Sequence, residues 1–194
     1  MIPAEPRYVF HTQQSDTAPN SLNNTDLAFI GEGVDDRGSA TIKKLKEASQ
    51  YVSSLRFDAR NQITYLDSKE TNRERLVSHV RDKAKILIDA TTLGLGEILQ
   101  ILLAVKKAGN TKVEFLYAEP KEYTRNLTEK TIDPRLRDFS LTENCNFCSV
   151  LGFAHEYQSN MRATHIFLLG FERARMLSAL EQRNDFNREL YHCH

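Results

Sequence analysis

Short apolar runs alternate along the chain with longer segments of helical spacing. The runs are rich in apolar, β-branched and aromatic residues and predict strands at residues 27–30, 63–66, 86–88, 113–117 and 165–169. After the first run and the turn Gly31-Glu32-Gly33, one helical face would hold Ile42, Leu45, Ser49, Val52 and Leu55. This spacing predicts a helix that continues to residue 55.

Three further segments also predict helices. A charged helix is expected over residues 72–80, and a helix that is apolar nearly all round, and therefore buried, over residues 95–105. Gly109 follows it and suits a left-handed cap, while a final helix is expected from about Glu172. Strands that alternate with helices are typical of right-handed βαβ units. We therefore predict an α/β, Rossmann-like fold with a mostly parallel sheet flanked by helices.

The length of 194 residues fits a single large domain. Residues 1–26 predict an N-terminal strand and a mobile arm, because residues 8–10 are apolar and residues 13–26 are rich in Ser, Thr, Asn and Asp. Residues 27–194 then form the Rossmann-like domain, with an irregular insertion around residues 120–163. The chain stops without a clear terminal element, so a longer parent protein remains an open alternative.

Charge and composition narrow the expected partners. Lys and Arg together number 26, as do Asp and Glu, so the chain lacks the basic field of a protein that binds nucleic acid through net charge. No apolar run approaches the roughly 18 residues of a membrane span, and the N-terminus lacks the apolar segment of a signal peptide. Three cysteines do not describe a disulfide framework. These features favour a cytoplasmic protein without a membrane partner.

The segment after the third strand carries the first candidate site. Open α/β sheets bind ligands beyond the carboxyl ends of their strands. Here Asp89 closes a strand, Thr91 and Thr92 supply hydroxyls and an N-cap, and Gly94 leaves amides open at a helix start. This pattern suits a phosphate or ribose, and the alternative is a capped helix without a ligand. The spaced glycines of dinucleotide-binding and P-loop motifs are absent from the sequence.

A repeated plan supplies the second candidate. Residues 27–37 and 166–173 each contain an apolar strand, a glycine and an acid-arginine pair that opens a helix. Gly31 and Gly33 form the first turn, and Arg37 and Arg173 would lie where helix N-termini favour anions. The arginines would then grip a phosphate or carboxylate. The alternative is that the acids stabilise the helix ends and each arginine pairs with a neighbouring acid.

Residues 86–94 resemble the CARF-type Rossmann sensor domains of prokaryotic immunity. In those domains an apolar strand ends in a motif of Asp, Thr and Gly, and the next helix N-terminus holds a nucleotide second messenger. The resemblance implies a homodimer, a nucleotide ligand, a role in antiviral defence and an effector on another chain. Where those domains place a small hydroxyl residue and a lysine, this chain has Leu95, Gly96 and Glu97, and Glu97 would repel phosphate.

Enzymatic alternatives rest on acids that follow strands. Asp67, Asp89 and Glu119 could bind a divalent cation or share acid-base work if their carboxylates converge. His155 lies in an irregular stretch and is the histidine freest to act as a base. Solvated loop acids are the structural alternative.

A zinc site is a further candidate, because Cys145 and Cys148 form a C-x-x-C pair and the tail contains His192 and His194. A redox pair and ordinary half-buried cysteines are the alternatives. The leading hypothesis is a sensor or regulatory module that binds a small phosphorylated ligand, a nucleotide, and acts as a homo-oligomer or through a partner effector. A nucleotide- or phosphoester-processing enzyme and a structural assembly subunit are the competing hypotheses.

Overall fold

The computed structural model describes residues 22, 24–109, 112–120, 150 and 152–153. The chain divides into two compact units, residues 1–57 with 64–118 and residues 58–63 with 119–194. The described helices and almost all strand residues belong to the first unit. Within the described residues, no helix has both the length and the apolar character needed to cross a membrane.

The first unit is built on a six-stranded sheet with the order β4-β3-β2-β1-β5-β6. The elements in chain order are β1 (Thr25–Ile30), α1 (Asp36–Ala48), β2 (Ser49–Asp58), β3 (Ile63–Leu66), β4 (Lys69–Thr71), α2 (Arg73–Val80), β5 (Ile86–Asp89), α3 (Leu95–Ala108) and β6 (Val113–Leu116). Strand β1 pairs in parallel with β2 and β5, and β5 pairs in parallel with β6, whereas β3 and β4 are antiparallel. This architecture confirms the predicted α/β, Rossmann-like fold.

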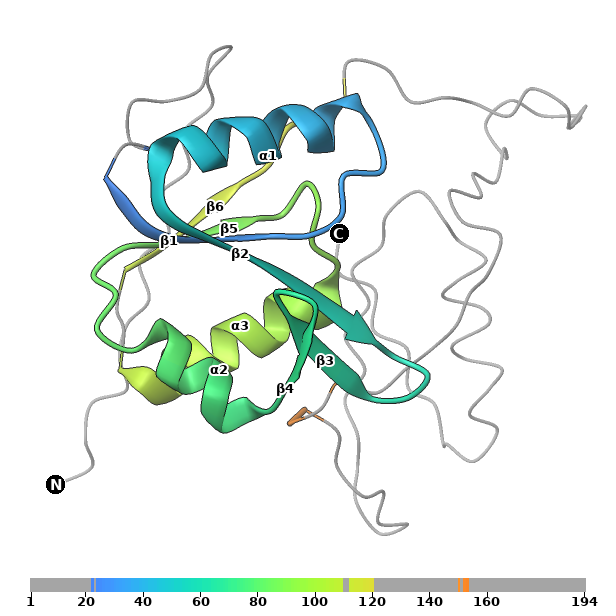
Figure 1. Cartoon of the computed structure of the whole chain (residues 1–194), viewed down its shortest axis with the longest axis vertical. Helices are drawn as coiled ribbons and strands as arrows, with labels where there is room; N and C mark the ends of the chain where they lie inside the picture. Colours follow the sequence, from blue (N-terminus) through green and yellow to red (C-terminus); the bar gives the residue numbers. More distant parts are fainter. Residues whose placement is uncertain (1–21, 23, 110–111, 121–149, 151, 154–194) are drawn as a thin grey trace, which may run out of the picture. The chain divides into compact units, whose positions relative to one another are not determined.

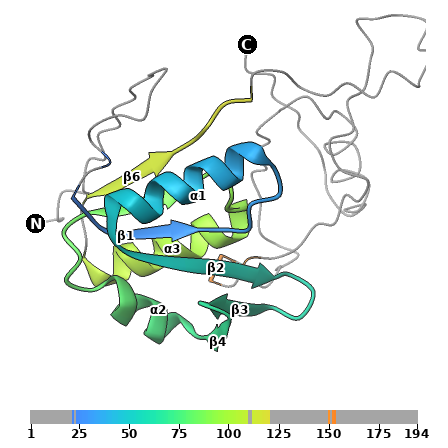
Figure 2. The same ribbon diagram turned by 45° about the horizontal axis from the view of Figure 1, so that its top comes forward.

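Helices cover both faces of the central strands, with α1 on one side and α2 and α3 on the other (Figures 1 and 2). Alternate residues of β1 therefore enter different cores, since successive strand side chains point to opposite faces. Leu27 and Phe29 pack in the core that includes α2 and α3 residues, while Ala28 and Ile30 pack with Leu45 of α1. A strand buried on both faces reads as a continuous apolar run, as β1 and β5 do.

The predicted first helix was wrong beyond residue 48. Helix α1 ends at Ala48, and the following ten residues form β2, which pairs in parallel with β1. Val52 and Leu55 are three residues apart, which fits a helical face equally well. In the strand they lie on opposite faces, because Leu55 belongs to the core under α2 and α3 and Val52 packs with the core under α1. The helical spacing was therefore coincidental.

Other predicted elements are confirmed with small changes. Helix α2 begins after Asn72, whose side chain caps it, and α3 ends at Ala108 with Gly109, which has φ +80°, as its C-cap. Strand β4 was not predicted; it follows a tight turn at Asp67 and Ser68, which both have positive φ. Helix α3 is also less buried than expected, because Leu95 is 67 % exposed. The predicted strands at residues 8–10 and 165–169, the final helix and most of the insertion lie outside the described residues.

Candidate functional site

The strand order reverses beside β1, which makes this position the topological switch point of the sheet. From β1 the chain passes through α1 to β2 on one side, and β5 is paired on the other side. Loops that leave the carboxyl ends of β1 and β5 diverge at such a point and bound the usual ligand crevice of an open α/β sheet. Gly31 and Asp89 stand at these two strand ends.

Asp89 lies at the base of this region, fully buried. The hydroxyls of Thr41 and Thr92 each donate to its Oδ2 over 2.8 Å, and the backbone N–H of Thr91 donates to its Oδ1 over 3.0 Å. These bonds offset the cost of burying a carboxylate. Asp89 therefore joins α1, the end of β5 and the turn after β5, and its oxygens face protein donors rather than solvent.

The turn after β5 packs directly against Gly31. The N–H of Gly31 donates to Oγ1 of Thr92 over 2.9 Å, and a Cβ at Gly31 would overlap the carbonyl oxygen of Thr92 and lie 2.6 Å from its carbonyl carbon. Backbone atoms cannot yield as a flexible side chain can, so only glycine fits here. The crevice is consequently filled at this depth, and any ligand has to bind further out.

The outer layer is formed by the loop that leads into α1. Glu32, Gly33 and Val34 are exposed, and Val34 is 88 % exposed. Asp35 caps α1 by accepting the N–H of Gly38, and Arg37 donates to Asp35 Oδ2 from Nε over 2.9 Å and from Nη2 over 2.7 Å. The capping bond and the guanidinium lower the pKa of Asp35. The same pairing raises the pKa of Arg37, so this arginine stays charged.

The residues after β6 complete this outer layer. The N–H of Ala118 donates to Oγ1 of Thr91 over 2.9 Å, and Nη1 of Arg37 donates to the carbonyl of Ala118 over 3.3 Å. Tyr117 is 57 % exposed and close enough to Arg37 to help raise its pKa. We use the name switch-point rim for the set Glu32, Gly33, Val34, Arg37 and Tyr117. The rim offers one guanidinium, one carboxylate, one phenol, an apolar side chain and exposed backbone.

The start of α3 differs from the predicted phosphate cradle. Gly94 is the N-cap and has no side-chain cap bond, but the carboxylate of Glu97 lies beside it and accepts the N–H of Phe57 over 2.8 Å. A negative charge thus already occupies the positive end of this helix. Gly96 packs against the ring of Phe57. A phosphate at Gly94 would have to approach the Glu97 carboxylate.

The predicted ligand-binding residues therefore separate into two layers. Gly31, Asp89 and Thr92 are joined by hydrogen bonds beneath the rim, and Thr91 connects this network to Ala118. The outer residues are Gly33 and Arg37, together with Gly94 at the start of α3. Six other candidate residues lie outside the described residues, namely Cys145, Cys148, His155, Arg173, His192 and His194.

The predicted acidic cluster is not assembled in the first unit. Asp67 follows β3 and accepts the N–H of Ser54 over 2.8 Å, while Asp89 ends β5. Strand β1 lies between β2 and β5, so β2 and β5 are about 10 Å apart at the usual strand spacing. Glu119 belongs to the second unit. In the part of the chain that the structure describes, no three His, Cys, Asp or Glu side chains form a group that could hold a metal ion.

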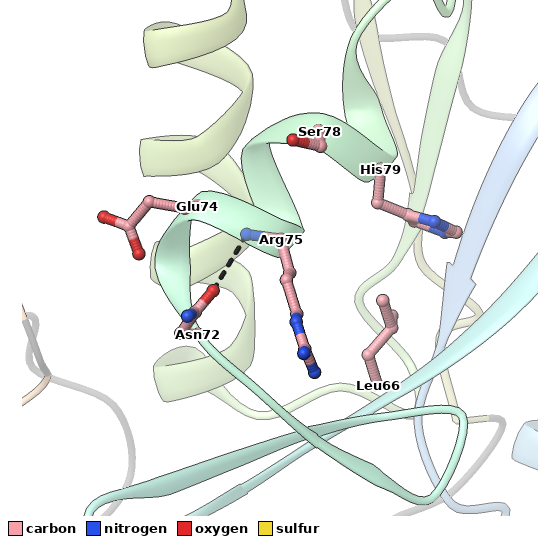
Figure 3. A pocket seen from close by; sticks show the side chains of 6 residues that line it. All are labelled: Leu66, Asn72, Glu74, Arg75, Ser78 and His79. Carbon is pink, nitrogen blue, oxygen red and sulfur yellow. Dashed lines mark hydrogen bonds between the residues drawn. The ribbon is translucent and has the colours of Figure 1, made fainter.

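Sequence reasoning also missed a polar pair and a pocket. Ser53 of β2 and His79 of α2 are joined through Oγ and Nε2 over 2.8 Å, and His79 lines an open pocket of about 470 Å³ beside α2 (Figure 3). The spacing of Arg75 and His79, four residues apart on a helix, was the signal that could have pointed to this face. The sequence carries no signal for the pairing of His79 with Ser53, because the two residues are 26 positions apart.

Comparisons with protein-family models, with curated proteins and with solved structures found no match. The class of protein is defined by the fold, which is an α/β, Rossmann-like domain with its switch point between β1 and β5. Function must accordingly be argued from the chemistry of the site, because one such fold hosts many unrelated activities.

Proposed function

We propose that this domain is a sensor or regulatory module that binds a small phosphorylated ligand, a nucleotide, at the switch-point rim. The observation that carries the proposal is the place of Arg37. Its side chain is 38 % exposed and stands at the start of α1, beside the switch point. A guanidinium recognises phosphate through paired N–H groups, and the helix start adds a favourable dipole.

The rim chemistry narrows the ligand class. Arg37 could exchange its long 3.3 Å bond to the Ala118 carbonyl for a phosphate oxygen while it stays oriented by Asp35. Tyr117 offers an exposed ring on which a base can stack. Glu32 and Asp36 are also exposed near Arg37, so their charges oppose a polyphosphate. A nucleoside monophosphate or a cyclic nucleotide fits this balance better, with ribose hydroxyls donating to a rim carboxylate.

Thermal unfolding in the presence of mononucleotides and cyclic nucleotides tests the proposal. A ligand at a hundred times its dissociation constant adds about 2.7 kcal/mol to the free energy of unfolding. Arg37→Ala should abolish this stabilisation, and Arg37→Lys should weaken it because the fork geometry is lost. Lys44→Ala removes the same charge from an exposed position of α1 and is the matched control. A panel without any ligand-linked shift would overturn the proposal.

Assembly is the second part of the proposal. Leu95 is exposed, and Leu99 and Leu103 follow it at four-residue intervals, on the side of α3 opposite the buried Ile101 and Ala104. An apolar stripe of this kind favours association with a second copy or a partner effector. Light scattering after gel filtration should show an oligomer that Leu95→Glu dissociates; a monomeric parent chain would contradict self-association. The extension to antiviral defence rests on the CARF resemblance of residues 86–94.

A further inference from the structure

The pocket beside α2 lies on a different part of the domain from the switch-point rim. Its lining consists of Leu66, Asn72, Glu74, Arg75, Ser78 and His79. In Figure 3 the side chains of Arg75 and His79 leave α2 on the side where Leu66 lies, with the ring of His79 pointing to the sheet, whereas Glu74 points away on the other side. The pocket therefore combines a guanidinium and an imidazole with one apolar side chain, that of Leu66.

Two charged side chains line this pocket, Arg75 and Glu74, and Glu74 points away from Arg75 (Figure 3). The Arg75 side chain is exposed, and none of the carboxylates in the described part of the chain lies within ion-pair distance of its guanidinium. The backbone N–H of Arg75 is capped by the side chain of Asn72 over 2.9 Å. The pocket thus adjoins the first turn of α2, where backbone N–H groups and the helix dipole favour negative charge.

Contacts with two residues of the sheet, Ser53 and Phe29, fix the position of the His79 ring. Its Nε2 is bonded to the hydroxyl of Ser53, and its ring meets the ring of Phe29 at an interplanar angle of 63° with the centroids 6.0 Å apart. Because Nε2 is engaged, Nδ1 is the ring nitrogen left for a ligand. Ser53 is only 4 % exposed, so it is a positioning residue for the imidazole and not a nucleophile.

One anionic and one cationic side chain, Asp67 and Lys83, act on His79. Burial lowers the pKa of His79, and nearby Lys83 lowers it further, whereas Asp67 raises it. Asp67 is the acid that acts on His79, and its Oδ1 already accepts the backbone N–H of Ser54. Arg75 is the cation that lines the pocket, and Glu74, which also lines it, forms no ion pair with it.

We propose that this pocket is a second binding site, which takes the oxyanion group of a small molecule. Arg75 holds the phosphate or carboxylate, Nδ1 of His79 donates a hydrogen bond to it, and Leu66 contacts an adjoining apolar part of the molecule. The site shares no residue with the switch-point rim, so this proposal is independent of the proposed nucleotide function and is tested separately.

Ring NMR signals of His79, assigned by comparison with His79→Gln, give the direct test. The full chain is titrated separately with inorganic phosphate and with acetate, which distinguishes the two sources of an oxyanion. Binding should shift the His79 signals saturably and raise the pKa of its imidazole, because an adjacent anion favours the imidazolium. A shift with one probe alone identifies the oxyanion, and a shift with both supports a site for the shared chemistry.

Matched variants localise the effect. Arg75→Ala should weaken the binding about tenfold or more, as expected for the loss of a charge-assisted bond, and Arg75→Lys should weaken it less. Arg81→Ala removes the same charge from an exposed position at the end of α2 and should leave the binding unchanged. Arg37→Ala should also leave it unchanged. His79 signals that do not respond at millimolar phosphate or acetate, or that respond equally in Arg75→Ala and Arg81→Ala, would overturn the proposal.

Discussion

Replacing Asp89 with alanine tests whether this acid is structural. Its carboxylate accepts bonds from the hydroxyls of Thr41 and Thr92 and from the N–H of Thr91, and it is fully buried. In the variant, Thr41 can still donate to the carbonyl of Gly38, which is 3.0 Å away. Two donors, the Thr92 hydroxyl and the Thr91 N–H, then lose their partner.

The expected loss of stability follows from those two donors. An unsatisfied buried donor costs about 1–3 kcal/mol, and because Thr91 and Thr92 are only partly buried the two together cost about 2–4 kcal/mol. Removal of a buried charge returns part of this cost, because the carboxylate no longer has to be desolvated. We expect Asp89→Ala to lower the free energy of unfolding by about 2 kcal/mol, a large share of the about 5–15 kcal/mol typical of a domain.

Urea unfolding followed by circular dichroism measures this difference. Glu47→Ala is the control, because Glu47 is exposed on α1 and such surface changes stay within about 0.5 kcal/mol. A loss no larger than that of Glu47→Ala, within about 0.5 kcal/mol, would refute the reasoning, because Asp89 would then behave as a surface residue. An increase in stability would go further and indicate that the acid is kept for function at a cost to the fold.

Three other predictions concern stability and use the same unfolding measurement. Gly31→Ala should cost about 2–3 kcal/mol, because the added methyl group meets the backbone of Thr92, and an unchanged midpoint would contradict the close packing. Gly109→Ala should cost about 1 kcal/mol from its φ of +80° alone, since nothing lies within 4 Å of the new methyl; a neutral change would argue against the left-handed cap. The pKa of His79 is lowered from 6.5 by burial, so the unfolded chain binds its proton at a higher pH than the folded chain. Its contribution to stability should therefore be complete above about pH 6.5 and decrease as the pH falls below it, and His79→Gln should flatten this part of the profile.

The parts of the fold that the sequence predicts correctly are those with a single local explanation. Strands β1 and β5 are continuous apolar runs, which suit strands buried on both faces, and Gly109 marks a helix end by cap chemistry. Strand β2 was missed because Val52 and Leu55 satisfy a helical period as well as opposite faces of a strand. Pairing with β1, which is set by tertiary contacts, decides between the two.

The sequence predicted where the candidate site lies but not which contacts form within it. The sequence indicates an acid, hydroxyls and glycines at one strand end, and strand-end placement is a local property. It does not indicate that Thr41, 48 residues away, donates its hydroxyl to Asp89, or that Glu97 reaches Phe57. Those contacts depend on how helices pack on the sheet. They move Asp89 and Thr92 beneath the surface and leave Arg37 as the exposed cation of the rim.

Hydrogen bonds nevertheless connect the buried network around Asp89 to the rim. Thr92 links Asp89 to the N–H of Gly31, from which the loop of the rim begins, and Thr91 links Asp89 to Ala118, which Arg37 also contacts. A single carboxylate thereby sets the positions of both segments that carry rim residues. Binding sites gain affinity when such a supporting layer fixes their geometry before the ligand arrives. Asp89 therefore affects a ligand at the rim through position, whereas Arg37 affects it through contact.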